Sequence, residues 1–253
     1  MKYLYVTIAR RGRRLSYTFI GTLGAGVILA ASAGVFAEGG EDKREPVRDN
    51  GGAVQAADFP IGEHLFGLSA PRLHGRILIY PPGMDPPANV NPDATTGWKL
   101  TRLYDLEGAR KAGLVISPEA LPPRYAVTSG SAMLATKPDG SSEYTESGLQ
   151  ITGAGYPIDV YRSIPSQHYA NQPYSLPAWL DGNVMTTLGS VRGIPAVFVH
   201  KRAGIKTPEL QQVFVDDGDR VILIEGYVDE FAKLVKIAES ILANAGKGDP
   251  NVR

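Results

Sequence analysis

Four histidines are the first side chains to consider for catalysis or metal binding, and they lie far apart in the sequence: His64, His74, His168 and His200. None belongs to a His-Glu-x-x-His pair, and the chain has neither a Gly-x-Ser-x-Gly turn nor a glycine-rich phosphate loop that ends in Lys-Ser or Lys-Thr. It also has no cysteine, which excludes disulfides, thiolate metal sites and a cysteine nucleophile. We therefore expect no metal, no cofactor and no enzymatic activity. One alternative stays open, a hydrolase site of Asp, Glu and His that only the fold assembles.

Aromatic side chains give the best candidate for a binding surface. Residues 156–183 interleave tyrosines and a tryptophan with four prolines. Aromatic rings with polar tips are common at interfaces, and prolines lower the entropy that a loop loses when it docks. The candidate partner-binding residues are Tyr156, Tyr161, Tyr169, Tyr174 and Trp179. The alternative is that these rings pack a long loop onto its own domain.

The charge distribution excludes nucleic acid as a partner. The formal net charge is zero, but Lys2 and four arginines precede the first acidic residue, Glu38. Residues 38–253 then carry 21 basic and 26 acidic side chains, without a basic cluster. Binding to phosphates needs a basic face, which this part of the chain lacks.

The N-terminus predicts a membrane segment. A basic cluster is followed by residues 15–37, which contain no charged side chain; the cluster is Arg10, Arg11, Arg13 and Arg14. A helix of this length reaches about 34 Å, enough to cross a hydrocarbon core of about 30 Å. The arginines orient such a helix with its N-terminus in the cytoplasm, so we expect a single-pass protein of the cell membrane whose C-terminal domain is extracytoplasmic. The alternative is a signal peptide cleaved after Ala33 or Ala37, and hence a secreted protein.

These segments divide the chain into five parts. We expect a cytoplasmic basic segment at 1–14, the transmembrane helix or signal peptide at 15–37, a tether and partly ordered lead-in at 38–97, an extracytoplasmic α+β domain at 98–246 and a tail at 247–253. The lead-in contains one strand-like run at 76–80, which is followed by turn-forming Pro-Pro-Gly.

The sequence of this domain predicts a series of strands between two helices. Asp105 can cap a short helix at 106–112 that Gly113 ends. Runs rich in β-formers follow at 125–134, 144–152, 158–164, 196–200, 210–215 and 220–227. Consecutive strands without intervening helices favour an antiparallel sheet. Asp217-Gly218 marks a hairpin turn, which we prefer to a calcium site of Asp216, Asp217 and Asp219 because the spacing differs from that of a calcium loop.

A C-terminal helix completes the expected fold. Asp229 can cap a helix that runs to Ala245 and ends at Gly246. Its apolar side chains recur at helical spacing: Phe231, Leu234, Val235, Ala238, Ile241 and Leu242. The sequence therefore predicts an α+β fold, an antiparallel sheet with this helix packed on one face.

Two stretches give the chain a resemblance to a known family. Residues 105–114 (DLEGARKAGL) lead into 118–125 (PEALPPRY), and residues 225–227 (EGY) precede 236–241 (KIAESI). Both resemble a family of bacterial extracytoplasmic domains of unknown function found behind a membrane helix, and more loosely the C-terminal domain of the sigma-E regulatory protein RseB (MucB). Arg124 stands where the family pattern prefers glycine.

The resemblance implies a non-enzymatic protein of envelope signalling or anti-sigma regulation, built on an antiparallel sheet backed by a helix. Together with the N-terminal segment, it leads us to expect a membrane-anchored domain that binds a protein partner. One alternative is a carrier or sensor of a lipid or small apolar ligand held between sheet and helix. The exported hydrolase is the second.

Overall fold

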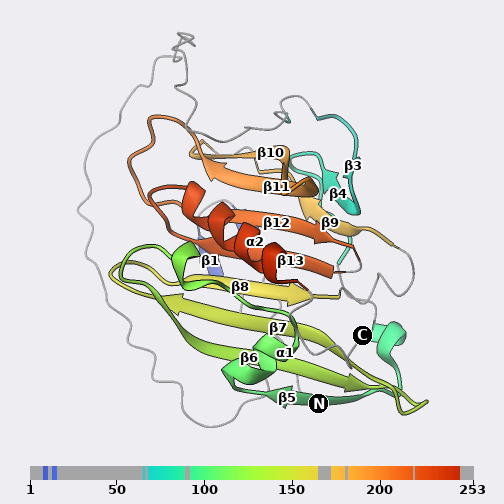
Figure 1. Cartoon of the computed structure of the whole chain (residues 1–253). Helices are drawn as coiled ribbons and strands as arrows, with labels where there is room; N and C mark the ends of the chain where they lie inside the picture. Colours follow the sequence, from blue (N-terminus) through green and yellow to red (C-terminus); the bar gives the residue numbers. More distant parts are fainter. Residues whose placement is uncertain are drawn as a thin grey trace. The chain divides into compact units, whose positions relative to one another are not determined.

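The computed structural model describes residues 8–10, 13–15, 65, 68–88, 92–164, 172–179, 182–218 and 220–245 (Figure 1). These fall into two compact units, one within residues 1–51 and one within residues 52–253. In the first unit, β1 (Ile8–Arg10) pairs with β2 (Arg13–Leu15). The rest of the expected membrane segment, Arg11 and the expected tail lie outside the described residues. Among the described residues, no helix has both the length and the apolar character needed to span a bilayer.

An antiparallel sheet of eight strands forms the second unit. Its spatial order is β10-β11-β12-β13-β8-β7-β6-β5. The strands are β5 (Lys99–Leu103), β6 (Ala126–Thr136), β7 (Ser142–Thr152), β8 (Ile158–Ser163), β10 (Val184–Val191), β11 (Ile194–Lys201), β12 (Gln211–Asp217) and β13 (Arg220–Gly226). All six strands expected after residue 98 are present. The two that the sequence did not indicate, β5 and β10, are the two edges of this sheet.

Helix α2 (Ala232–Asn244) packs on one face of this sheet, as predicted (Figure 1). Leu234, Ile237 and Ile241 are fully buried in a cluster, here called the first core, which also contains Val213, Val215, Ile222 and Ile224 of the central strands. The expected cap was wrong: the helix begins after Phe231, without a side-chain cap. Asp229 instead accepts a hydrogen bond at 2.7 Å from the Nζ of Lys233, which lies about one helical turn after it in the chain.

Helix α1 (Leu106–Lys111) lies on the same face, over β6 and β7. The Asp105 carboxylate accepts a hydrogen bond from the backbone N–H of Gly108, and Gly113 ends the helix with φ +88°, so both predicted ends are confirmed. Arg162 of β8 lies beneath this end: its guanidinium donates to the Ala112 carbonyl at 3.1 Å and pairs with Asp217. One-turn 3₁₀ helices occupy Pro92–Thr95 and Pro118–Ala120.

A second layer covers the opposite face of β10–β13. Its strands are β3 (Arg72–His74), β4 (Ile77–Tyr80) and β9 (Tyr174–Pro177), in the order β3-β4-β9, with β4 and β9 parallel. They form the second core with side chains from the large sheet: Leu65, Ile77, Ile79, Leu176, Ala178, Leu188, Val197, Val199, Phe214 and Val221. The strand expected at 76–80 is therefore integral to the fold, which extends N-terminally beyond the domain start expected at residue 98.

The turn between β3 and β4 fastens this layer to the large sheet. The N–H of Arg76 donates to the buried Asp216 carboxylate at 2.6 Å, and the Arg76 guanidinium donates to the Gly218 carbonyl at 2.9 Å. The His74 ring lies 2.7 Å from the Gly189 carbonyl oxygen. Gly75 has φ +60°, and a Cβ here would lie 2.5 Å from the Asp216 carboxylate, so the approach requires glycine. Asp216 and Asp217 thus have structural partners, and Gly218, with φ +73°, confirms the hairpin turn.

The first core predicts a severe effect of charge at Leu234. We expect Leu234→Asp to lower the free energy of unfolding by more than about 4 kcal/mol, because a carboxylate replaces a fully buried side chain. Thermal melting followed by circular dichroism should show loss of the cooperative transition. Ala243→Asp, at an exposed position of the same helix, is the matched control and should melt close to the parent protein. An unchanged transition in Leu234→Asp would show that α2 is dispensable.

Candidate functional site

The five candidate aromatic residues separate into three environments. Tyr174 and Trp179 pack against the second core. Tyr161 lies on a part of the large sheet that no other described helix or strand covers, and Tyr156 lines a pocket at one end of the sheet. Tyr169 lies outside the described residues. The segment is therefore not one continuous binding loop, because β8 and β9 occupy part of it.

Tyr174 and Trp179 have the contacts of packing residues. The Trp179 ring stacks on Phe214 with a centroid separation of 6.4 Å and an interplanar angle of 11°. Its backbone N–H donates to Thr186 Oγ1 at 2.8 Å. Burial raises the pKa of Tyr174, with a further contribution from the Glu225 carboxylate. These contacts favour packing over partner binding for both residues.

One face of β5–β8, which no other described helix or strand covers, is the first candidate site. It lies opposite α1, and two adjoining hollows on it share Ser131, Gly148 and Tyr161. We call this surface the open sheet face and define it by Arg102, Tyr104, Ser131, Glu146, Asp159 and Tyr161. Tyr161 is 45% exposed and Tyr104 is 77% exposed. Large aromatic side chains are thus presented among small polar ones.

Electrostatics give the open sheet face an acidic character. Arg102 lies 3.9 Å from Glu146, and Gln150 Nε2 donates to Asp159 at 3.2 Å. Burial, and then the carboxylates of Asp159 and Glu225, raise the pKa of Tyr161 to about 12. Tyr161 therefore presents a neutral hydroxyl at physiological pH, beside more negative than positive groups.

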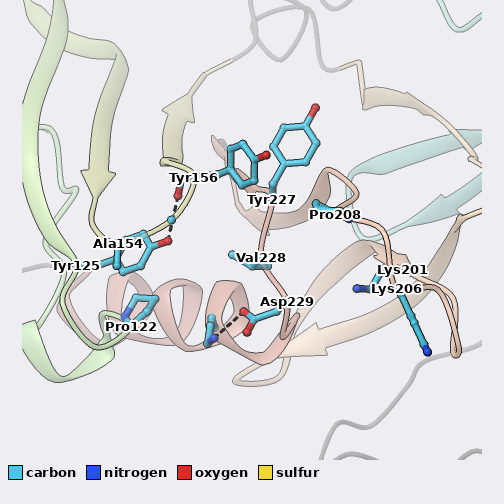
Figure 2. A pocket seen from close by; sticks show the side chains of 12 residues that line it. Pro122, Tyr125, Ala154, Tyr156, Lys201, Lys206, Pro208, Tyr227, Val228 and Asp229 are labelled. Atoms are coloured by element: carbon cyan, nitrogen blue, oxygen red, sulfur yellow. Dashed lines mark hydrogen bonds and ion pairs between the residues drawn. The ribbon is translucent and has the colours of Figure 1, made fainter. Parts of the chain in front are cut away.

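The second candidate site is a pocket of about 410 Å³, which we call the end pocket (Figure 2). Its lining includes three tyrosines and three lysines, namely Tyr125, Tyr156, Tyr227, Lys201, Lys206 and Lys233. They come from the starts or ends of four strands, the loop after β11 and the first turn of α2. Sequence reasoning found only Tyr156 among them, because Tyr125 and Tyr227 looked like ordinary strand residues.

The tyrosines of the end pocket are fixed by one another. The ring centroids of Tyr156 and Tyr227 lie 5.3 Å apart. The Tyr125 hydroxyl donates a hydrogen bond to the Tyr156 carbonyl at 3.2 Å (Figure 2). Lys233, which also lines the pocket, pairs with Asp229 at 2.7 Å and with Glu230 at 3.6 Å. The hydrogen bond from Lys233 lowers the pKa of Asp229 and raises that of Lys233.

The two described histidines do not form a joint site. His200 of β11 lies against the Phe231 ring on the α2 side, with centroids 5.5 Å apart. His74 belongs to β3, in the layer on the opposite face of the sheet. Within the described part of the chain, no group of three or more His, Asp or Glu side chains could hold a metal ion.

The different environments of Trp179 and Tyr156 predict different effects on stability. We expect Trp179→Ala to lower the free energy of unfolding by about 2–4 kcal/mol, because the ring leaves a void beside Phe214. Tyr156→Ala should cost less than about 1 kcal/mol, since that ring is 56% exposed. Chemical denaturation of the two variants compares them directly. Equal stability of both variants would contradict the packing assignment of Trp179.

Tyr161 should ionise at unusually high pH. The difference in ultraviolet absorbance between the parent protein and Tyr161→Phe should show a tyrosine half-ionised near pH 12, whereas the urea-unfolded pair should show one near pH 10. A raised pKa in the folded state means that this residue's stabilising contribution is complete below pH 10 and is lost as the pH rises towards 12. The parent protein should therefore lose stability relative to Tyr161→Phe in that window. Ionisation of folded Tyr161 near pH 10 would contradict this environment.

The chain matches no protein-family model, no curated protein and no solved structure.

Proposed function

We propose that this chain is a single-pass membrane protein whose extracytoplasmic α+β domain binds a protein partner without catalysing a reaction. Its role is that of an accessory in envelope signalling, of the anti-sigma type. The uncharged run after four arginines supports the membrane anchor, and the family resemblance supports the regulatory role.

The observation that carries protein binding is the open sheet face. The eight-stranded sheet has α1 and α2 on one side, but the second layer covers only the β10–β13 half of the other side. On the uncovered half, Tyr104 and Tyr161 stand exposed beside the small residues Ser131 and Gly148. Exposed aromatic residues on a rigid sheet lose little entropy on binding and are enriched at interfaces.

Charge indicates which kind of partner suits this face. Glu146, Asp159 and Glu225 outnumber Arg102, since the guanidinium of the other lining arginine, Arg162, is bound to Ala112 and Asp217 on the α1 side. Glu225 is held near Tyr161 by Gln212, whose Nε2 donates to it at 2.8 Å. A partner surface with lysine or arginine around an apolar centre would complement this arrangement.

The backbone at Arg124 adds support to the resemblance. Its φ is +66°, in the left-handed region that glycine adopts without strain. The family's preference for glycine thus has a physical reason at this position, and the chain adopts the same type of turn with an arginine.

The carrier alternative receives less support. A ligand between sheet and helix needs space beneath α2, yet Leu234, Ile237 and Ile241 are fully buried against Ile222 and Ile224. The hydrolase alternative is also less favoured, because the two described histidines lie on opposite faces of the sheet.

Native mass spectrometry of the full-length protein, released gently from its own membranes, tests the proposal. We expect an uncleaved chain carrying a second polypeptide. The double variant Tyr104→Ala/Tyr161→Ala should lose this polypeptide, since both rings lie on the open sheet face, while Tyr156→Ala is the matched control and should retain it. Dissociation should also increase with salt, because the face is acidic.

Three results would contradict the proposal. A second polypeptide retained by the double variant would mean that the open sheet face is not the interface. Bound lipid in place of a polypeptide would favour the carrier. A bare chain trimmed near Ala33 or Ala37 would indicate a secreted domain.

A further inference from the structure

We propose that the end pocket binds a small acidic sugar, that is, a sugar ring carrying a carboxylate or a phosphate. This inference goes beyond protein binding: the pocket and the open sheet face have no defining residue in common. It rests on two features of the pocket: two lysines without an ion-pair partner among the described residues on one side, and a pair of tyrosine rings on the other (Figure 2).

Lys201 and Lys206 supply the positive charge. Among the described residues, neither side chain has an ion-pair partner, although both line the pocket. The third lysine, Lys233, pairs with both Asp229 and Glu230, so these three groups carry a net charge of −1 and the five groups together carry +1. The pocket thus keeps two ammonium groups available, and a carboxylate or phosphate is the ligand group that they would bind.

The start of α2 adds to this potential. The helix runs for 13 residues from Ala232 without a side-chain cap, and the N–H groups of Lys233 and Leu234 donate to the carbonyls of Glu230 and Phe231, so its N-terminus contributes through the helix dipole. Lys233 and Asp229 place this first turn at the wall of the pocket. The helix end supports the anion site formed by the two lysines.

The tyrosines indicate what the anionic group is attached to. Tyr156 and Tyr227 are 56% and 46% exposed, and their rings lie side by side with the fixed Tyr125 nearby. Such rings offer both a flat apolar surface and hydroxyl groups. A sugar ring has the matching combination of a C–H face and hydroxyls, whereas a lipid tail would cover the Tyr156 and Tyr227 hydroxyls without forming hydrogen bonds to them.

Size is consistent with this class of ligand. Small-molecule pockets commonly span about 300–1,000 Å³, and 410 Å³ lies at the lower end of that range. The end pocket therefore suits one or two sugar units.

Isothermal titration calorimetry of the full-length protein in detergent tests this site. The probes are galacturonate, galactose 1-phosphate and neutral galactose. We expect at least one acidic probe to bind roughly tenfold or more tighter than galactose, because the lysines contribute charge-assisted hydrogen bonds. Trigalacturonate distinguishes the two sources of the acidic sugar. If it binds more tightly than galacturonate, the natural ligand is a unit of a polymer; if it binds more weakly, the natural ligand is a free sugar.

Matched variants locate the binding. Lys201→Gln/Lys206→Gln should weaken it by roughly tenfold or more. Lys236→Gln, an exposed lysine of α2 outside the pocket, should leave it unchanged. Tyr227→Ala should weaken binding of the acidic sugar with an unchanged melting temperature, since Tyr227 is half-exposed.

The proposal is overturned if neither acidic probe binds, if galactose binds equally well, or if the double lysine variant binds like the parent protein. Inorganic phosphate that binds as tightly as galactose 1-phosphate would also overturn it, because the rings would then contribute nothing. None of these results depends on the open sheet face or on a protein partner.

Discussion

The arrangement of this domain depends on three central strands, β11, β12 and β13, whose side chains are buried on both faces. Along β11, Ala196 and Phe198 enter the first core while Val197 and Val199 enter the second. Phe214 of β12 likewise points away from its neighbours Val213 and Val215. Apolar groups on both faces require a layer on each side. The helix supplies one layer and the small sheet supplies the other. Strands β5–β8 need only one such layer, and no described helix or strand covers their second face.

Sequence reasoning found the elements that local chemistry specifies. The Asp-Gly hairpin, the Asp105 cap and the apolar stripe of α2 each depend on residues close together in the chain, and the structure contains all three. The second layer depends on pairing between distant segments, since Ile77 of β4 lies opposite Tyr174 of β9. The sequence did contain an indication of this second layer: the apolar runs of β11–β13 are uninterrupted, which is typical of strands buried on both sides. The edge strands were harder to predict from the sequence, because β5 is mostly exposed and polar and β10 is interrupted by Gly189.

The sites were less predictable than the fold. A stretch rich in aromatic residues does not reveal which rings face inward, and here neighbours in sequence such as Tyr156 and Tyr161 serve different surfaces. The end pocket combines Tyr125, Tyr156 and Tyr227 with lysines from other elements, so no spacing in the sequence could indicate it. Strand ends do offer one usable signal. A tyrosine at the first or last position of a strand pattern lies at an end of the sheet, and Tyr125, directly before β6, and Tyr227, directly after β13, are both of this kind.

The parallel pairing of β4 with β9 also has a consequence for how the chain is made. During synthesis, the apolar strand Ile77-Leu78-Ile79-Tyr80 emerges long before β9, β11 and β12, which bury it. Until then β3 can pair with only one of its edges, and the other is an open hydrophobic strand edge of the kind that initiates aggregation. Pro81 and Pro82 follow it directly and cannot donate to a β-ladder, so they limit extension of the strand by another chain. The two prolines therefore keep this open edge short during the interval before β9 is synthesised.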